Sequence, residues 1–116
     1  MNAEPPAPAP VFDELIHQPT RLTVVAFLSG CAEAEFRTVR ESCGVSESAL
    51  SKVVSTLEAA SYVKVRRGYV GKRPRTWLRL SPEGRRALAC HLAELQRIAA
   101  TATALAATLD HQPPPP

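Results

Sequence analysis

The sequence predicts an α+β fold, mainly α, in which short helices precede one β-hairpin and a long C-terminal helix. Three observations support this prediction. Apolar residues recur at helical spacing through the first half of the chain, residues 62–80 contain two segments of alternating apolar and polar character, and residues 84–109 lack proline. A chain of 116 residues, 45% hydrophobic and 22% charged, has room for one small domain.

Both ends of the chain are expected to lie outside the folded domain. Residues 1–10 contain four prolines and three alanines, and residues 113–116 are all proline. Proline removes a backbone donor and interrupts regular hydrogen bonding, so such segments stay extended. We therefore expect disordered tails at 1–10 and 111–116 and a single domain at 11–110.

The composition favours a cytoplasmic protein without a metal or cofactor. No apolar segment reaches the roughly 18 to 20 residues that cross a bilayer, and the N-terminus has no signal-peptide pattern. Cys31, Cys43 and Cys90 lie far apart, without the short paired spacings of metal sites and redox motifs. We expect reduced thiols that pack as small hydrophobic side chains.

Two abutting helices are expected at the start of the domain. Phe12, Leu15 and Ile16 occur at helical spacing, and Pro19 suits the first position of a second helix. That second helix should continue through residues 22–28 and end near Gly30.

A pair of helices around a glycine turn should follow. Residues 35–43 predict a short helix, and Gly44 can adopt the left-handed conformation that ends it. Ser46 is a suitable N-cap for a helix at 46–60, in which apolar residues recur at positions 50, 54 and 57. The opposite face of that helix carries Ser48, Ser51, Lys52 and Ser55.

The predicted hairpin concentrates positive charge. Residues 62–67 and 76–80 have the period-two pattern of strands, which places its tip at 68–74. Between Ser61 and Leu80 there are seven Lys or Arg residues and no acid, although the whole chain carries only +3. A polyanion is the natural partner of such a patch, since a solvated charge run would contain interspersed acids. Trp77 is expected to anchor the hairpin by packing.

The last predicted element is a long helix at 82–109, introduced by Ser81 and Pro82. It carries an apolar stripe with alternating spacings of four and three, as in a coiled coil. We expect this stripe to form a homodimer interface rather than to fold back on its own subunit. The expected interface comprises Phe12, Leu15, Ile16, Leu88, Leu92, Leu95, Ala99, Ala102, Leu105, Ala106 and Leu109.

This order of elements resembles the winged helix-turn-helix fold, and two motifs sharpen the resemblance. The segment from Gly44 to Val63 resembles the recognition-helix region of small MarR-like transcriptional regulators. The segments Gly71 to Trp77 and Leu80 to Gly84 resemble their wing and the start of the following helix. The resemblance implies that helix 46–60 enters the major groove of DNA and that the wing at 68–75 reaches a minor groove or flanking phosphates. It also implies a homodimer on a palindrome-like operator, and gene repression.

The residues expected to contact DNA lie on these two elements. Short hydroxyl side chains allow close approach of a helix to the groove, and arginine suits a narrow, electronegative minor groove. The candidates are Ser46, Ser48, Ser51, Lys52, Ser55, Arg67, Lys72, Arg73 and Arg75. Little chain remains for the ligand cavity of longer MarR proteins, so a small-molecule effector stays an open question.

The sequence leaves three alternatives to a simple DNA-binding repressor. An enzyme is not expected, because the sequence has no phosphate-binding glycine loop, metal-ligand cluster or nucleophile-base pattern, and its histidines are scattered. A winged-helix domain that binds protein partners is possible in principle, since fold does not dictate function. A thiol-responsive DNA-binding regulator using Cys31, Cys43 or Cys90 is the third alternative.

Overall fold

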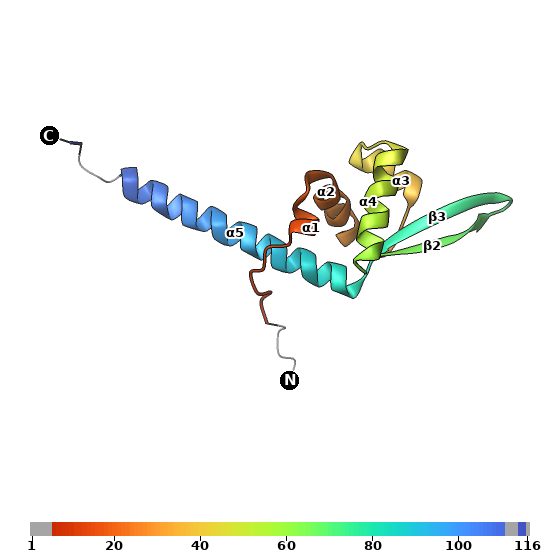
Figure 1. The fold of residues 1–116 in the computed structure, drawn as a ribbon, viewed down its shortest axis with the longest axis horizontal. Helices are drawn as coiled ribbons and strands as arrows, with labels where there is room; N and C mark the ends of the chain where they lie inside the picture. The colour runs from red at the N-terminus through yellow and green to blue at the C-terminus, as the bar shows by residue number, and fades with distance from the viewer. Residues whose placement is uncertain (1–5, 111–113, 116) are drawn as a thin grey trace.

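Five helices and a three-stranded sheet form the part of the chain that the computed structural model describes, residues 6–110 and 114–115 (Figure 1). The mainly helical α+β fold is confirmed. Residues 6–10 are exposed and have no helix or strand. The other expectations for the tails, at residues 1–5, 111–113 and 116, lie outside the described residues. The elements are α1 (Glu14–His17), α2 (Pro19–Ser29), β1 (Ala34–Glu35), α3 (Phe36–Cys43), α4 (Glu47–Ala59), β2 (Val63–Val70), β3 (Arg73–Leu80) and α5 (Pro82–Asp110).

Helices α1 and α2 abut as the sequence predicts. The carboxylate of Asp13 caps α1 by accepting hydrogen bonds from the N–H groups of Leu15 and Ile16, at 2.9 and 3.2 Å. Pro19 occupies the start of α2, where its missing N–H leaves no intrahelical bond unmade. Gly30 follows the last residue of α2.

The pair α3 and α4 also follows the prediction. Gly44 ends α3 with a φ of +66°, in the left-handed region that glycine adopts without strain. Ser46 caps α4 by accepting a hydrogen bond from the N–H of Ala49 at 3.1 Å. The buried stripe of α4 consists of Leu50, Val53, Val54 and Leu57.

The sheet differs from the sequence prediction in two respects. The hairpin has longer strands than expected, because β2 reaches Val70 and β3 begins at Arg73, which leaves Gly71 and Lys72 as the turn. Gly71 has a φ of +63°, as the first central residue of a two-residue hairpin turn requires. The second difference is β1, a short third strand that pairs with β3 and contains Glu35, which the sequence placed in the following helix.

The core lies where α1, α2, α4, the base of the hairpin and the first turns of α5 meet. Two residues expected at a dimer interface belong to this core: Ile16 is fully buried and Leu88 is 5% exposed. They therefore have no surface to offer a second subunit, because α1 packs between α2 and α5. The buried hydrophobic residues are Ile16, Val24, Val25, Leu28, Val39, Leu50, Val53, Val54, Leu57, Val63, Leu78, Leu80 and Leu88.

Only the first part of α5 packs against this core, and the rest projects away from it (Figure 1). Every residue from Gln96 to Asp110 is exposed. The 29-residue helix is about 43 Å long at 1.5 Å per residue. Across the described residues, none of the helices is both long enough and apolar enough to pass through a membrane.

Gly84 allows the first turn of α5 to touch the chain that leaves α4. A Cβ atom added at Gly84 would overlap the carbonyl oxygen of Tyr62 and would lie 2.8 Å from a methyl carbon of Leu80. The carbonyl of Tyr62 cannot retreat freely, because it also accepts the N–H of Ser81 at 2.9 Å. Glycine is therefore required here for close approach and not for an unusual φ.

We predict that Gly84→Ala lowers the free energy of unfolding by about 1–3 kcal/mol through overpacking, although alanine favours a helix by about 1 kcal/mol. Urea unfolding followed by circular dichroism measures the change. Gly30→Ala is the matched control, because a Cβ there meets only the carbonyl oxygen of Phe27 at an ordinary 3.5 Å. A Gly84→Ala protein as stable as the control would contradict the close packing described here.

Candidate nucleic-acid interface

The polar face of α4 and one face of the hairpin line a common groove. Ser51 and Ser55 of α4 lie on one side of it, and Arg67 of β2 and Thr76 of β3 lie on the other. Thr76 was not among the residues expected from the sequence. The remaining residues that line the groove are Phe36, Glu47, Val54, Glu58 and Val65.

The side chains expected to face DNA from α4 are exposed. Ser48, Ser51, Lys52 and Ser55 all lie on the side of the helix that points away from the core. Ser46 is exposed too, but its hydroxyl is occupied as the N-cap of α4 and lies 3.4 Å from that of Ser48. Its role in the structure is therefore to begin the helix.

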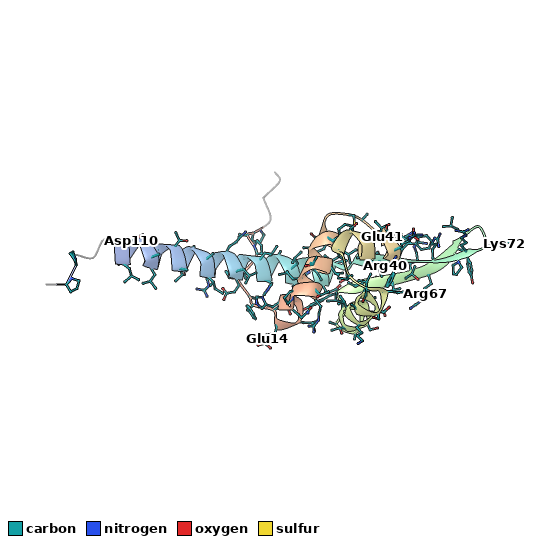
Figure 2. The ribbon with its side chains drawn as sticks, turned by 90° about the horizontal axis from the view of Figure 1, so that it is seen from above. Glu14, Arg40, Glu41, Arg67, Lys72 and Asp110 are labelled. Atoms are coloured by element: carbon teal, nitrogen blue, oxygen red, sulfur yellow. The ribbon has the colours of Figure 1, made fainter. Side chains whose placement is uncertain are left out.

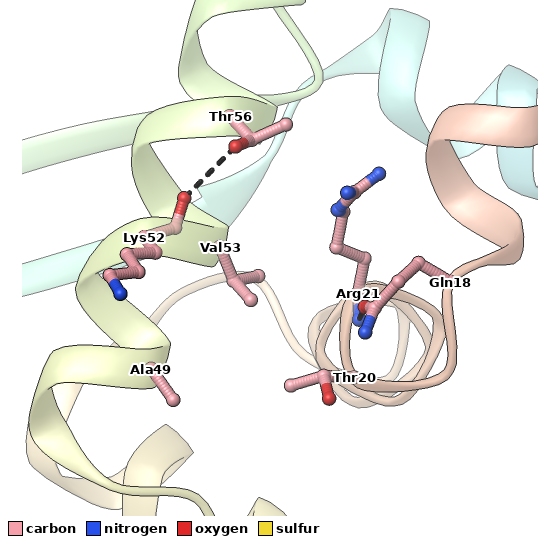
Figure 3. Close-up of a pocket in the computed structure, with 7 residues that line it drawn as sticks. All are labelled: Gln18, Thr20, Arg21, Ala49, Lys52, Val53 and Thr56. Atoms are coloured by element: carbon pink, nitrogen blue, oxygen red, sulfur yellow. Dashed lines mark hydrogen bonds between the residues drawn. The ribbon is translucent and has the colours of Figure 1, made fainter.

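Lys52 borders a pocket between α4 and the start of α2. Together with Thr56 it lines this pocket, whose opposite wall is the start of α2, including Thr20 and Arg21 (Figure 3). The hydroxyl of Thr56 donates to the carbonyl of Lys52 at 3.0 Å, so it is satisfied within the helix. Arg21 donates to the carbonyl of Leu15 at 2.8 Å, which ties its guanidinium to the subunit.

The basic residues of the hairpin are divided between its two faces. Residues paired across antiparallel strands point to the same face, and successive residues alternate. Arg67 pairs with Thr76 and faces α4, whereas Arg66, paired with Trp77, is on the opposite face. Lys72 is exposed at the tip of the hairpin, at the far end of the molecule from Asp110 (Figure 2).

Acidic side chains near β1 pair with two of the hairpin arginines. Glu33 accepts two hydrogen bonds from Arg66, at 2.7 and 3.2 Å, and the guanidinium of Arg66 lies 4.1 Å from the ring centroid of Trp77. The hydrogen bond from Arg66 holds the pKa of Glu33 below its usual value. Glu35 forms an ion pair with Arg75 at 3.0 Å. Trp77, half-buried beneath Arg66, packs within the sheet as expected.

The positive charge available to a ligand is therefore smaller than the sequence suggests. The hairpin itself contains no acid, but Glu35 of β1 and Glu33 just before β1 bring two carboxylates to it. Within residues 6–110, five exposed basic residues of the hairpin form no ion pair, and neither does Lys52 of α4; the five are Lys64, Arg67, Lys72, Arg73 and Arg79. Arg75 was expected to contact DNA, but its ion pair with Glu35 makes its charge less available to a phosphate.

The three cysteines are half-buried free thiols. Burial raises the pKa of the Cys43 thiol. Because the thiolate is the reactive form, this shift makes Cys43 less reactive and favours the packing role over thiol sensing. Among the described residues, no group of three or more metal-ligating side chains is placed to hold a metal ion.

Large apolar side chains of α5 are exposed to solvent. Leu92, Leu105 and Leu109 are 39%, 60% and 56% exposed, in positions expected at a dimer interface. Ile98, 46% exposed, was missed, although it follows Leu95 by three residues and precedes Leu105 by seven. The remaining expected positions are Leu95, which is partly buried, and Ala99, Ala102 and Ala106, which are exposed.

The N-terminal residues expected at that interface contact their own subunit. Phe12 is 42% exposed, yet its ring packs against the imidazoles of His17 and His91, with centroids 4.7 and 4.9 Å apart. Leu15 is partly buried and packs against the core. The two histidines, which appear scattered in the sequence, meet here.

Comparison with known proteins agrees with this geometry. Residues 20–99 match the family described as winged helix DNA-binding domain. No curated protein sequence matches the chain. Among solved structures, a transcriptional regulator homologue from Pyrococcus horikoshii OT3 is similar at a TM-score of 0.72 and 21% identity, over 77% of this chain and 88% of that one.

Two further structures are similar over most of the chain. The PcaV transcriptional regulator from Streptomyces coelicolor, solved with its natural ligand, has a TM-score of 0.66 and 26% identity, over 80% of this chain and 64% of PcaV. The chain thus spans less than two thirds of that regulator. ZitR, a zinc-responsive MarR family member from Lactococcus lactis, has a TM-score of 0.53 and 19% identity, over 74% of this chain and 58% of ZitR.

The family match covers most of the chain and contains α3, α4, the hairpin and the packed part of α5. The resemblance to MarR-like winged-helix regulators, inferred from the recognition-helix and wing motifs, is confirmed. The protein belongs to the winged helix DNA-binding domain family.

Proposed function

We propose that this protein is a sequence-specific, DNA-binding transcriptional regulator that acts in the cytoplasm as a homodimer and represses genes by occupying an operator. One observation carries the proposal: the hydroxyl face of α4 and Arg67 of the hairpin line the same groove. In this arrangement α4 enters the major groove, while the hairpin tip reaches the neighbouring minor groove or its phosphates.

The exposed charges suit this mode of binding. Lys52 lies on α4, Arg67 lines the groove beside Glu47 and Glu58, and Lys72 and Arg73 are exposed at the tip. Exposed cations thus extend from α4 to the end of the hairpin. Each phosphate that such a cation neutralises releases condensed counterions, which makes binding depend on salt. A dimer that neutralises roughly six to ten phosphates would lose affinity steeply as salt rises.

The distal half of α5 supports a second copy of the chain as the partner. Residues 98–109 contain no charged side chain, although all are exposed. The hydroxyls of Thr101, Thr103 and Thr108 donate to backbone carbonyls four residues earlier, which further reduces the polarity of the surface. An exposed apolar helix face of this kind marks an interaction surface. The coiled-coil spacing of its apolar side chains suits pairing with the same helix of a second copy.

A homodimer explains how one short helix could specify a site. Two-fold symmetry presents two copies of α4 to two half-sites, and their centres fit successive major grooves when they lie about 34–36 Å apart. The corresponding operator is palindrome-like. Occupation of such a site within a promoter would exclude other proteins from it, which is the basis for proposing repression.

The first prediction of the proposed function concerns DNA recognition itself. Selection of bound sequences from random DNA should enrich a palindrome-like site whose half-site centres lie about 10 base pairs apart. Gel retardation should then show preferential binding to that site at low salt. Failure to retard any duplex at low salt would remove the main support for a regulator and would favour a protein-interaction module.

The second prediction separates free arginines from paired ones. Arg73→Ala should reduce the slope of log affinity against log salt by about 0.9 for each phosphate that the Arg73 guanidinium neutralises. Arg75→Ala is the matched comparison and should change the slope less, because Glu35 already binds that guanidinium. Fluorescence anisotropy at several salt concentrations measures both slopes. Equal slopes for the two variants would show that the ion pair does not restrain Arg75 on DNA.

The third prediction concerns the subunit interface. Leu105→Glu should convert the dimer to a monomer, because it places a charge in the apolar face of α5 outside the subunit core. Ala100→Glu is the control, since position 100 lies on the opposite side of the helix and should leave the dimer intact. Light scattering measures the masses at micromolar concentration. A monomeric wild-type protein, or a dimeric Leu105→Glu variant, would exclude this interface.

A further inference from the structure

A network of polar side chains fastens the segment before α1 to α5. The backbone N–H of Asp13 donates to Nδ1 of His91 at 3.0 Å, and the hydroxyl of Tyr62 donates to Oδ2 of Asp13 at 2.6 Å. Nε2 of His91 lies 3.1 Å from Nδ1 of His17. We call Asp13, His17, Tyr62 and His91 the clasp.

The hydrogen bonds of the clasp fix the protonation of its histidines. Nδ1 of His91 accepts the N–H of Asp13, so it carries no proton, and the proton of the neutral ring is on Nε2. That N–H donates to Nδ1 of His17, which must therefore be unprotonated as well. The bonded clasp thus requires a neutral His91.

His91 is the buried centre of the clasp, whereas His17 is exposed. His91 is fully buried, and the ring of Phe12 packs across both imidazoles. The N–H of Val11 donates to the carbonyl of Cys90 at 3.1 Å, which holds the preceding residue of the segment on α5. The segment at residues 11–13 is therefore attached to α5 by both backbone and side-chain contacts.

Tyr62 connects the clasp to the recognition helix. It lies three residues beyond the end of α4, and its N–H donates to the carbonyl of Leu57 at 2.9 Å. The hydrogen bond to Asp13, with smaller contributions from burial and the charge of Asp13, raises the pKa of Tyr62 to about 12. Tyr62 therefore remains a donor throughout the physiological pH range and joins the end of α4 to the clasp.

We propose that the clasp is a positioning device for operator binding: it sets the orientation of α5 relative to α4, and hence the spacing of the two recognition helices in the dimer, and protonation of His91 releases it. This inference rests on the proposed function. It assigns Asp13, His17, Tyr62 and His91 a positioning role, since none of them lies on the groove that faces DNA.

Acid should open the clasp for a geometric reason. A proton added at Nδ1 of His91 would point at the N–H of Asp13, and two donors cannot share that bond. Burial, and then the neighbouring His17, hold the pKa of His91 below 6.5, while Asp13 acts in the opposite direction. Because the folded pKa is lowered, the contribution of the neutral clasp is present above pH 6.5 and is lost as the pH falls further.

The other ionisable groups on the elements around His91 are few, and none of them accepts the N–H of Asp13 in place of His91. The segment before α1 contributes Asp13, α1 contributes His17, and Tyr62 acts through Asp13. On α2 the charged side chain is Arg21, bonded to the carbonyl of Leu15. On α5 itself, Glu94 is paired with Arg97, and Glu83 and Arg86 line one pocket with Asp13 and Tyr62.

Two variants test the clasp on the operator recovered by selection and on versions with one base pair added or removed between the half-sites. Tyr62→Phe removes the hydroxyl but keeps the ring, and it should lower the preference for the selected spacing by roughly fivefold or more. His91→Gln offers one acceptor and one donor but does not titrate. The His91→Gln protein should bind the operator at pH 7.5. Its affinity should not fall towards pH 5.5, whereas the affinity of the wild type should.

Glu14→Gln is the control, because Glu14 is an exposed carboxylate of α1 outside the clasp. It should retain the spacing preference and the pH profile of the wild type. If Tyr62→Phe keeps the wild-type spacing preference, or the wild type has no acid response that His91→Gln removes, the inference is overturned while DNA binding stands. If the wild type binds no duplex at all, the proposed function itself fails.

Discussion

The close contact between Gly84 and the backbone of Tyr62 is the constraint on which the rest of the architecture depends. At this point the chain leaving α4, the end of the hairpin and the first turn of α5 meet without space for a Cβ atom. Hydrogen bonds reinforce the contact: the Ser81 hydroxyl donates to the carbonyl of Ser61 and accepts the N–H of Gly84. Ser61 adopts a φ of +63°, unusual for a residue other than glycine, so the junction tolerates local strain to bring these elements together.

This junction joins the DNA-binding surface to the first turn of the long helix. Tyr62 belongs to both the junction and the clasp, because its carbonyl oxygen meets Gly84 and its hydroxyl donates to Asp13. Glu33 and Glu35 add a second restraint by binding two arginines of the hairpin, Arg66 and Arg75. Exposed ion pairs contribute little to stability, so their main effect is to decide which arginines stay available for phosphates.

Local signals made much of the fold predictable. Gly44, Ser46 and Pro19 act through backbone preferences that hold in almost any context, and the structure places each at the helix end that the sequence indicated. The residues that line the groove were partly predictable, because Ser51, Ser55 and Arg67 lie on elements with clear periodicity. To predict that these residues share one surface, the order of the elements and the family resemblance were needed as well.

The missed features depend on contacts between distant parts of the chain. Strand β1 has two residues, too few for a periodic pattern, so the pairing of its Glu35 with Arg75 was invisible. His17 and His91 are separated by 74 residues and meet only because α1 packs on α5. Burial of Ile16 could not be separated from an interface role by spacing alone, since apolar spacing identifies a face and not its partner.

Methylation protection of guanine N7 atoms on a bound duplex tests most directly whether α4 and the hairpin together form the DNA-binding surface. These atoms lie in the major groove, which α4 should enter. We predict two protected major-groove segments one helical turn apart, and the protection of each should disappear when Ser51 and Ser55 are replaced by bulky acidic residues. Retardation of DNA without major-groove protection, or protection that survives those replacements, would contradict this arrangement.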